Sequence, residues 1–164
     1  MEFFNEGNRL FEEGKIEEAL SCYNQFINVS PNDVNSYLNK GKALKALGKH
    51  EEAIACYDQA IQLDPENYLG YQGKAEVLTT LKKNEEALPY CDKVISLNPN
   101  SDVIYAVKGD ILFEMGKYEE AIPCYDQTIS LNPQNVNGYQ MKGRSLARLG
   151  RFEEAIPYFD QVIT

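Results

Sequence analysis

Apolar and small side chains recur at helical spacing along residues 34–63 of this chain. In the first half of the segment, the residues that fall on one stripe at about 100° per residue are Tyr37, Gly41, Leu44 and Leu47. Gly48 is expected to end this first helix, since glycine is a common residue just past a helix. A second stripe is made by Ala53, Tyr57, Ala60 and Ile61. It predicts a second helix over about residues 51–63, which Pro65 ends because proline disfavours helical geometry in the residue before it.

The same plan returns every 34 residues along the chain. The residues that keep this interval at the ends of second helices are Pro31, Pro65, Pro99 and Pro133. A fixed period between about 20 and 50 residues marks a solenoid of stacked repeats, each touching only its neighbours. The sequence therefore predicts an all-α fold with a pair of helices in each repeat, in one solenoid over residues 1–164. The expected repeats are residues 1–33, 34–67, 68–101, 102–135 and 136–164.

Two recurring residue types bear on how these helices pack. Single glycines mark positions where two helices must approach closely, namely Gly7, Gly41, Gly109 and Gly143. Prolines stand near the start of three second helices, at Pro89, Pro123 and Pro157. Few amide donors have helical partners there, so we expect the helices to continue through these prolines.

The chain resembles the tetratricopeptide repeat, a helix–turn–helix unit of 34 residues, through the succession Tyr37, Gly41, Leu44, Ala53, Tyr57, Ala60 and Pro65. The resemblance extends over essentially the whole chain, with five repeats in phase. It implies a right-handed α-solenoid of stacked antiparallel helix pairs with a concave face. It also implies a protein-interaction scaffold, since members of this family usually bind other proteins.

Charge and composition exclude several classes of function. The net charge of −9 argues against a phosphate backbone as ligand, so no nucleic-acid partner is expected. His50 is the only histidine and no CxxC pair is present, so a zinc site lacks ligands. Paired glutamates open the second helices, where they complement the helix dipole rather than form a catalytic pair. We therefore expect no enzyme activity, no metal and no cofactor.

The start of the chain and its cysteines give expectations about its setting. Residues 1–6 have neither a basic start nor an apolar run, and no apolar stretch reaches membrane-spanning length. A cytoplasmic location and no membrane partner are expected. The distance between equivalent positions of neighbouring repeats is longer than a disulfide can span. We therefore expect free thiols in half-buried apolar surroundings at Cys22, Cys56, Cys91 and Cys124.

A column of lysines departs from the family pattern, which often has leucine at this place. Its members are Lys40, Lys74, Lys108 and Lys142. We expect their long stems to cover apolar surface while the amines reach solvent. The alternative is a charged recognition stripe.

The side of each first helix opposite the packing stripe is the predicted binding surface, and the resemblance places it on the concave groove. The candidate peptide-binding residues are Asn5, Asn8, Asn35, Leu38, Asn39, Lys42, Leu69, Gln72, Glu76, Val103, Val107, Asp110, Met141 and Arg144. Within this set an apolar strip is formed by Leu69, Val103, Val107 and Met141. The expected ligand is a short extended or helical segment of a partner protein. The alternative is a solvated face with scattered apolar residues.

Polar residues in the groove indicate in more detail which kind of ligand to expect. Asn5 and Asn39 resemble the asparagine ladder with which some family members bind a peptide backbone. One subgroup grips the terminal carboxylates of heat-shock chaperones, but Phe4, Leu69 and Gly73 stand where its basic residues would be, so that ligand is not expected. The charges along the groove alternate in sign: a basic group of Lys42 and Lys45, an acidic group of Glu76, Asp110 and Glu114, and a basic group of Arg144 and Arg148. This order predicts a ligand with hydrophobic anchors and a basic centre.

Two alternatives to peptide binding stay open. The chain stops soon after Phe159 and Val162 without a polar helix to cover the last repeat. Terminal repeats need such a cap for solubility, so end-to-end stacking into a homo-oligomer is one alternative. The other is that the chain is the substrate-recruiting segment of a larger enzyme.

Overall fold

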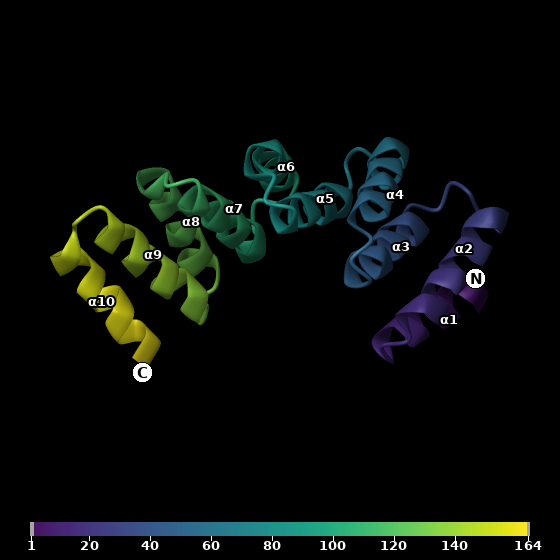
Figure 1. The fold of residues 1–164 in the computed structure, drawn as a ribbon, viewed down its shortest axis with the longest axis horizontal. Coiled ribbons are helices and arrows are strands. Elements are labelled where there is room, and N and C mark those ends of the chain that lie inside the picture. Colours follow the sequence, from purple (N-terminus) through teal and green to yellow (C-terminus); the bar gives the residue numbers. More distant parts are fainter. Residues whose placement is uncertain (1, 164) are drawn as a thin grey trace. The chain divides into compact units, whose positions relative to one another are not determined.

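The computed structural model describes residues 2–163 of the chain. In this range ten α-helices and no strands are present (Figure 1). The helices are α1 (Glu2–Glu12), α2 (Ile16–Val29), α3 (Val34–Ala46), α4 (His50–Leu63), α5 (Tyr68–Thr80), α6 (Asn84–Leu97), α7 (Asp102–Glu114), α8 (Tyr118–Leu131), α9 (Val136–Arg148) and α10 (Phe152–Ile163). The all-α fold class, with a helix pair in each repeat, is confirmed.

The helix boundaries follow the sequence signals closely. The predicted start of the second helix of the second repeat differs by one residue, because α4 begins at His50; its end at Leu63, two residues before Pro65, is as predicted. Helices α6, α8 and α10 continue through their prolines, as predicted; these are Pro89, Pro123 and Pro157. Each proline is the sixth residue of its helix, so each helix loses one backbone hydrogen bond near its start and keeps the rest.

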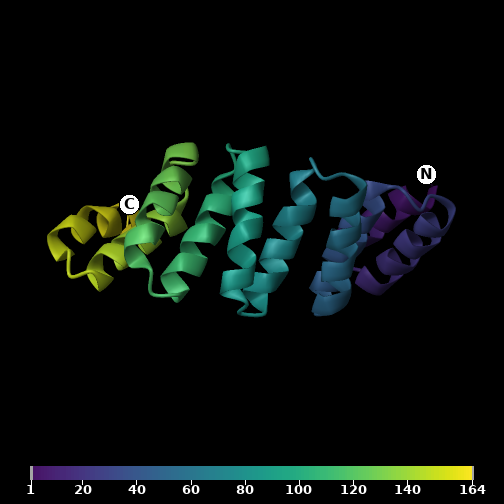
Figure 2. The same cartoon turned by 90° about the horizontal axis from the view of Figure 1, so that it is seen from above.

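The chain forms two compact units, unit 1 from Met1 to Lys82 and unit 2 from Lys83 to Thr164. Unit 1 contains α1 to α5, and unit 2 contains α6 to α10. Within each unit, every helix contacts the helix that follows it, and first helices of successive repeats contact each other, α1 with α3, α3 with α5 and α7 with α9. Each unit is therefore a stack of successive helices, made of two complete helix pairs and one helix of the third repeat (Figure 2).

The bends inside the repeats depend on a left-handed backbone residue. Gly48 has a φ of 72°, and a Cβ at this position would meet nothing within 4 Å, so its backbone conformation rather than space favours glycine. The amide of Lys49 then donates to the carbonyl of Leu44 at 2.9 Å, which satisfies a carbonyl at the end of α3. In the third repeat Lys82 holds the same place with a φ of 59°, a conformation that costs a non-glycine residue about 1–2 kcal/mol.

Side-chain caps begin three of the first helices. Asp33 accepts a hydrogen bond from the Ser36 amide at 2.8 Å, Asn67 from the Leu69 amide at 3.1 Å, and Asn135 from the Gly138 amide at 3.0 Å. Each bond satisfies one of the amides that a helix start leaves without a partner, and such a cap contributes about 1 kcal/mol. The caps therefore fix where α3, α5 and α9 begin, and with them the residues that each helix turns toward its neighbours.

The close packing of each repeat rests on an aromatic ring lying over a glycine. In the second repeat a Cβ on Gly41 would lie 2.8 Å from Tyr57 Cε1, too close for any side chain. The Tyr57 ring is 1% exposed and belongs to a buried cluster with Leu38 and Leu44. The same contact recurs as Gly7 with Tyr23, Gly109 with Tyr125 and Gly143 with Phe159. The prediction that these glycines allow two helices to approach closely is confirmed.

The lysine column forms ion pairs between neighbouring repeats. The pairs are Lys74 with Asp58 at 2.5 Å, Lys108 with Asp92 at 2.6 Å, and Lys142 with Asp126. Each joins a first helix to the second helix of the preceding repeat, and the lysine side chains are largely buried. Each ammonium ends beside a carboxylate that is about half exposed, so the pairs do not contradict the prediction that the amines reach solvent. The pairs also argue against a recognition stripe.

Two further expectations concern cysteines and apolar length. All four cysteines are free thiols, and Cys56, Cys91 and Cys124 are buried. Burial raises the pKa of the Cys91 thiol to about 12, so this thiol is an apolar packing group at neutral pH. Among the described helices, none combines the length and the apolar character that crossing a bilayer requires.

Candidate functional site

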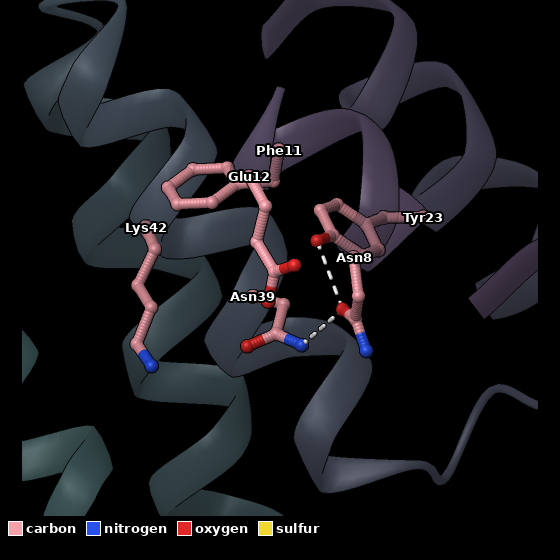
Figure 3. Close-up of a pocket in the computed structure, with 6 residues that line it drawn as sticks. All are labelled: Asn8, Phe11, Glu12, Tyr23, Asn39 and Lys42. Carbon is pink, nitrogen blue, oxygen red and sulfur yellow. Dashed lines mark hydrogen bonds between the residues drawn. The ribbon is translucent and has the colours of Figure 1, made fainter. Parts of the chain in front are cut away.

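A pocket of about 230 Å³ is lined by side chains of α1, α2 and α3 in unit 1, and we call it the first pocket (Figure 3). Its lining residues are Asn8, Phe11, Glu12, Tyr23, Asn39 and Lys42. All of them except Tyr23 stand on first helices. Three of the predicted site residues, Asn8, Asn39 and Lys42, therefore come together here.

Three side chains of the first pocket are joined by hydrogen bonds (Figure 3). The Tyr23 hydroxyl donates to Asn8 Oδ1 at 3.0 Å, and Asn39 Nδ2 donates to the same oxygen at 2.8 Å. Burial raises the pKa of Tyr23 to about 12, which keeps its hydroxyl a donor at neutral pH. Because both lone pairs of the Asn8 carbonyl are used, a ligand would meet the other ends of the two amides, Asn8 Nδ2 and Asn39 Oδ1.

A second pocket, of about 310 Å³, shares Phe11 and Lys42 with the first. Its lining residues are Phe11, Lys42, Lys45, Ala46, Tyr57, Leu69, Gln72, Gly73 and Glu76. The predicted site residues Leu69, Gln72 and Glu76 of α5 therefore lie beside Lys42 of α3. The shared residues make the two pockets one continuous surface along α1, α3 and α5.

The charges of the second pocket are partly paired. Lys45 Nζ forms an ion pair with Glu76, and Gln72 Nε2 donates to the other oxygen of this carboxylate at 3.0 Å. Lys42 is exposed and has no ionic partner among the described residues. The two lysines and one glutamate together leave a net charge of +1 on the lining of this pocket.

The hydroxyl of Tyr57 is buried and has no hydrogen-bond partner among the described residues. Burial raises the pKa of Tyr57, so the group stays a protonated donor at neutral pH. Buried polar groups are nearly always hydrogen-bonded, and an exception needs an explanation. This hydroxyl is therefore the least satisfied polar group that the two pockets contain.

Leu38 was predicted to face the groove, and this prediction is wrong. The side chain is 2% exposed and lies in the buried cluster with Leu44 and Tyr57. Helix α3 contacts α1, α2, α4 and α5, so its buried arc is wider than one stripe read at helical spacing. A ligand on the surface of unit 1 therefore does not reach Leu38.

Asn5 and Asn35 lie outside the two pockets. Asn5 lines a separate hollow near the start of α1, with Glu2, Phe3, Glu6 and Arg9. Asn39 bonds to Asn8 and not to Asn5, its equivalent in the first repeat. Asn35 is exposed in the first turn of α3 and lines neither pocket.

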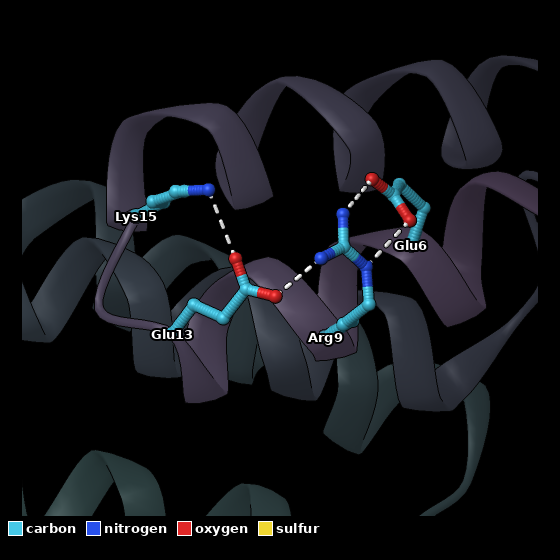
Figure 4. Close-up of polar contacts among 4 residues, drawn as sticks. All are labelled: Glu6, Arg9, Glu13 and Lys15. Atoms are coloured by element: carbon cyan, nitrogen blue, oxygen red, sulfur yellow. Dashed lines mark hydrogen bonds and ion pairs between the residues drawn. The ribbon is translucent and has the colours of Figure 1, made fainter.

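Exposed charges near this hollow form a network of their own (Figure 4). Arg9 donates to both carboxylate oxygens of Glu6, at 3.0 Å and 2.5 Å, and also pairs with Glu13. Lys15 donates to Glu13 at 2.9 Å. The hydrogen bond from Arg9 holds the pKa of Glu6 below its usual value. Because exposed pairs of this kind contribute little free energy and satisfy one another, we do not include them in the candidate site.

In unit 2 the candidate residue Asp110 is tied to the core. The Tyr125 hydroxyl donates to Asp110 Oδ1 at 2.9 Å, as Tyr23 does to Asn8 in the first repeat. Burial raises the pKa of the Asp110 carboxyl above its usual value, although the hydrogen bond from Tyr125 opposes this. Asp110 is therefore a half-buried hydrogen-bond acceptor and a poor attractor for a basic ligand.

The other candidate residues of unit 2 lie on α7 and α9. Met141 packs against the buried cluster of Leu112 and Tyr125, and the Arg144 guanidinium lies 5.1 Å from the centre of the Phe113 ring. Val103 is exposed and Val107 is half-buried, one turn apart on α7. Of the predicted apolar strip, Leu69 belongs to unit 1 and the other three residues belong to unit 2.

The candidate site is lined by groups that can form hydrogen bonds and apolar contacts. Its polar groups are amides, tyrosine hydroxyls, ammonium groups and carboxylates, set beside apolar side chains. Within residues 2–163, no three histidine, cysteine, aspartate or glutamate side chains gather as metal ligands do. Such a surface holds a partner by hydrogen bonds and apolar contact.

Sequence reasoning missed Tyr23 and Tyr57 as pocket residues, because it placed Tyr57 on a packing stripe and did not consider Tyr23. The signal was present in the sequence. Each ring lies over a glycine, and the residue after that glycine faces the hydroxyl, as Asn8 after Gly7 and Asp110 after Gly109 show. Reading that position together with the tyrosine would have identified the acceptor in the first and fourth repeats.

Sequence models of one family match the chain along most of its length. The tetratricopeptide repeat model matches residues 34–67, and related models described as tetratricopeptide or TPR repeats match residues 7–48, 70–101, 90–122 and 107–164. Together these matches span residues 7–164. No curated protein matches the chain by sequence.

Solved structures of MamA are similar to this chain. A double mutant, MamA RS-1 ArsTM, has a TM-score of 0.92 and 25% identity, over 98% of this chain and 90% of that one. A crystal structure of MamA has a TM-score of 0.89 and 25% identity, over 96% and 92%. MamA 41-end from Desulfovibrio magneticus RS-1 has a TM-score of 0.91 and 24% identity, over 98% and 91%. Because 416 solved chains match, the solenoid fold itself does not identify a partner.

Proposed function

This chain belongs to the tetratricopeptide repeat family, and on that premise we propose that it is a non-catalytic scaffold whose first-helix surface binds a segment of a partner protein. The segment lies along α1, α3 and α5, with apolar side chains against Phe11 and Leu69 and polar groups at the Asn8–Asn39 pair. Unit 2 carries candidate residues of its own, Val103, Val107, Met141 and Arg144.

One observation carries this proposal: the first and second pockets share Phe11 and Lys42 and together present apolar and amide groups side by side. A continuous surface of this composition suits a peptide, because main-chain amides need hydrogen-bond partners while anchoring side chains need apolar contact. We do not propose a basic centre in the ligand, although the order of charges along the groove predicted one. The carboxylates of Glu76 and Asp110 already have partners within the chain.

A display library of random peptides, selected against the full chain, tests the proposal. We expect enriched sequences with one or two large apolar residues, and binding that Leu69→Glu reduces at least about tenfold, because a charge cannot be buried cheaply in an apolar contact. The matched control is Leu131→Glu on α8, an exposed leucine that lines neither pocket.

Two results contradict the proposal. One is a selection with no enrichment over the starting library. The other is equal loss of binding in Leu69→Glu and Leu131→Glu, because this would place the ligand away from the pockets or show that the charge acts through the fold. Circular dichroism of both variants separates an unfolded protein from a folded one that has lost its ligand.

Self-association is a second candidate function, favoured by the apolar face of α10. Phe152 is 65% exposed and Ile156 is 57% exposed, one turn apart on this helix. Adjacent exposed apolar side chains are typical of interaction sites, and a second copy of the chain is one way to cover them. The end-to-end stacking expected from the last repeat therefore stays a proposal.

Light scattering over a hundredfold range of protein concentration tests this candidate. A mass that rises with concentration in the wild type, and does not rise in Ile156→Glu, supports self-association through α10. The matched control is Val136→Glu, an exposed apolar residue on α9. A mass of one chain throughout the range removes this candidate and leaves the peptide proposal untouched.

A further inference from the structure

The Tyr57 hydroxyl differs from its counterparts in other repeats. Tyr23 and Tyr125 stand at the same place in their repeats, and each hydroxyl donates to an acceptor in the same repeat, Asn8 or Asp110. The Tyr57 ring is as deeply buried as that of Tyr23, at 1% exposed, yet its hydroxyl has no partner. A buried donor without a partner is costly, so the site that contains it is prepared for an acceptor from outside.

The acceptor is missing because two residues change together. Lys42 stands in the second repeat where Asn8 stands in the first, and an ammonium group has no lone pair to accept a hydrogen bond. Gly73 stands in the third repeat where Asn39 stands in the second. A Cβ on Gly73 would overlap the Tyr57 ring, so no side chain can replace the missing amide. Two amide groups are therefore absent and a pocket lies in their place.

The second pocket has the size and charge to accept a small anionic group. Its volume is about 310 Å³, and its lining includes Tyr57, Lys42 and Gly73. Glu76 is paired with Lys45 and Gln72, while Lys42, which also lines the first pocket with Glu12, forms no ion pair among the described residues. Leu69 and Phe11 give the pocket an apolar side next to these donors.

We propose that the second pocket binds the side-chain carboxylate of an aspartate or glutamate in the partner segment. One carboxylate oxygen accepts from the Tyr57 hydroxyl, in the role that Asn8 Oδ1 has for Tyr23, and the Lys42 ammonium donates to the carboxylate. An apolar residue next to the acid contacts Leu69 and Phe11. Because the Tyr57 hydroxyl is covered in the free protein, we expect side chains that line the pocket to move as the ligand enters.

This inference rests on the proposed peptide-binding function and adds the chemistry of one subsite to it. The donors differ from those of the family subgroup that grips terminal carboxylates, whose basic residues are replaced here by Phe4, Leu69 and Gly73. The recognised group is a side chain within the segment, and the charge of the pocket favours a carboxylate over an amide or an ammonium group.

The first experiment uses propionate as a minimal carboxylate and propionamide as its neutral counterpart. Each is titrated into isotope-labelled full-length protein at constant ionic strength, and the amide signals of Gly73 and Leu69 are followed by NMR. We expect saturable shifts with propionate and at least about fivefold weaker binding of propionamide, because bonds to charged groups are the stronger class. No saturable shift with propionate at any concentration that preserves the fold contradicts the inference.

Variants of the two donors locate the binding. Tyr57→Phe and Lys42→Gln are each expected to weaken propionate binding about fivefold to tenfold. The matched controls are Tyr23→Phe, whose hydroxyl bonds Asn8, and Lys49→Gln, which removes an equal charge from an exposed lysine outside both pockets. Equal effects of Lys42→Gln and Lys49→Gln, or unchanged binding in Tyr57→Phe, contradict the subsite.

A second experiment separates this inference from the proposed function. The probes are three pentapeptides, blocked at both ends, with leucine followed by glutamate, glutamine or lysine between alanines. The glutamate peptide is expected to bind at least about fivefold more tightly than the glutamine peptide, and the lysine peptide more weakly than both. Equal binding of all three supports the peptide surface and overturns the carboxylate subsite. Propionate binding at Tyr57 without binding of any peptide supports the subsite and contradicts the peptide surface.

Discussion

The first and second pockets are built from equivalent positions of successive repeats, and they differ in how their tyrosine is satisfied. The ring of Tyr23 lies over Gly7 and that of Tyr57 lies over Gly41, with the same burial. The Tyr23 hydroxyl bonds to Asn8, while the Tyr57 hydroxyl has no partner. The ring position is thus constrained by packing, whereas the residue that faces the hydroxyl varies.

This difference indicates which residues of a repeat protein determine what it binds. The ring and the glycine under it determine the distance between two helices, so changing either alters the stack. The residue at the place of Asn8 faces the hydroxyl and is not part of this ring–glycine contact, whereas Gly73, at the place of Asn39 in the third repeat, is buried against the Tyr57 ring. A hydrogen-bonded pair of amides in one repeat step and a lysine with a glycine in the next therefore give two different binding surfaces on one framework.

The largest expected effect separates the core from the pockets. Leu38→Ala should lower the free energy of unfolding by about 3 kcal/mol, because it opens a cavity in the buried cluster around Tyr57. Leu69→Ala should cost only about 1 kcal/mol, since this side chain is half-buried at the edge of the same cluster. Urea denaturation followed by circular dichroism measures both. If Leu38→Ala lowers the free energy of unfolding no more than Leu69→Ala does, the Leu38 side chain is not buried in this cluster.

The next effect tests whether Gly73 is required by the Tyr57 ring. Gly73→Ala should destabilise the protein by about 2 kcal/mol, because the new Cβ overlaps the ring and overpacking outweighs the gain in helix propensity. Gly138→Ala is the matched control within a helix, since its Cβ would lie 3.1 Å from Ile129 Cγ1, where a small shift relieves the contact. Thermal unfolding of both variants gives the comparison, and equal melting temperatures would show that the second pocket has room for a side chain.

The fold was predictable to a large extent because it repeats. The interval between Pro31 and Pro65, and the glycine stripe that includes Gly41, report backbone geometry that each repeat must satisfy by itself. Because the same signal occurs in five repeats, a local exception such as Pro89 inside α6 does not obscure the pattern. The sequence also predicted that Asn8, Asn39 and Lys42 would share a surface, because helical spacing determines which residues of one helix face the same way.

The remaining features depend on contacts between helices, which spacing within one helix does not determine. Leu38 was placed in the groove because α3 was considered alone, yet four helices contact α3. The partner of Lys74 is Asp58 on the preceding helix, a pairing that needs the stacking distance. The unsatisfied hydroxyl of Tyr57 is visible only once the ring, Lys42 and Gly73 are placed together.

A smaller effect of opposite sign compares the two tyrosines directly. Tyr23→Phe should destabilise the protein by about 1 kcal/mol, because Asn8 loses one of its two donors. Tyr57→Phe should be neutral or stabilise by about 1 kcal/mol, because it removes a buried donor that has no partner. Denaturant midpoints with equal slopes measure both changes. A cost for Tyr57→Phe equal to that for Tyr23→Phe would mean that its hydroxyl is satisfied in the free protein.

The smallest effect extends the comparison to the fourth repeat, where an acid holds the place of Asn8. Asp110→Asn keeps an acceptor for the Tyr125 hydroxyl and removes the charge, so it recreates the first-repeat arrangement. The pKa of Asp110 is raised in the folded protein from its ordinary value of 3.8. The folded state therefore binds this proton more tightly than the unfolded state does. The stability that protonated Asp110 contributes is fully present below the pKa that Asp110 has in the unfolded state. It is lost as the pH rises through the pKa of Asp110 in the folded state.

Asp110→Asn should consequently be more stable than the wild type at neutral pH, by an amount that grows from pH 3.8 upward and becomes constant above the folded pKa. Denaturation at about pH 4 and about pH 8 measures the difference. Asp160→Asn on α10, where the carboxyl is exposed, is the control for removal of a charge. If the Asp110→Asn difference is constant over this range, the Asp110 carboxyl is solvated in the folded protein, and the fourth repeat then presents a full negative charge where the first presents an amide.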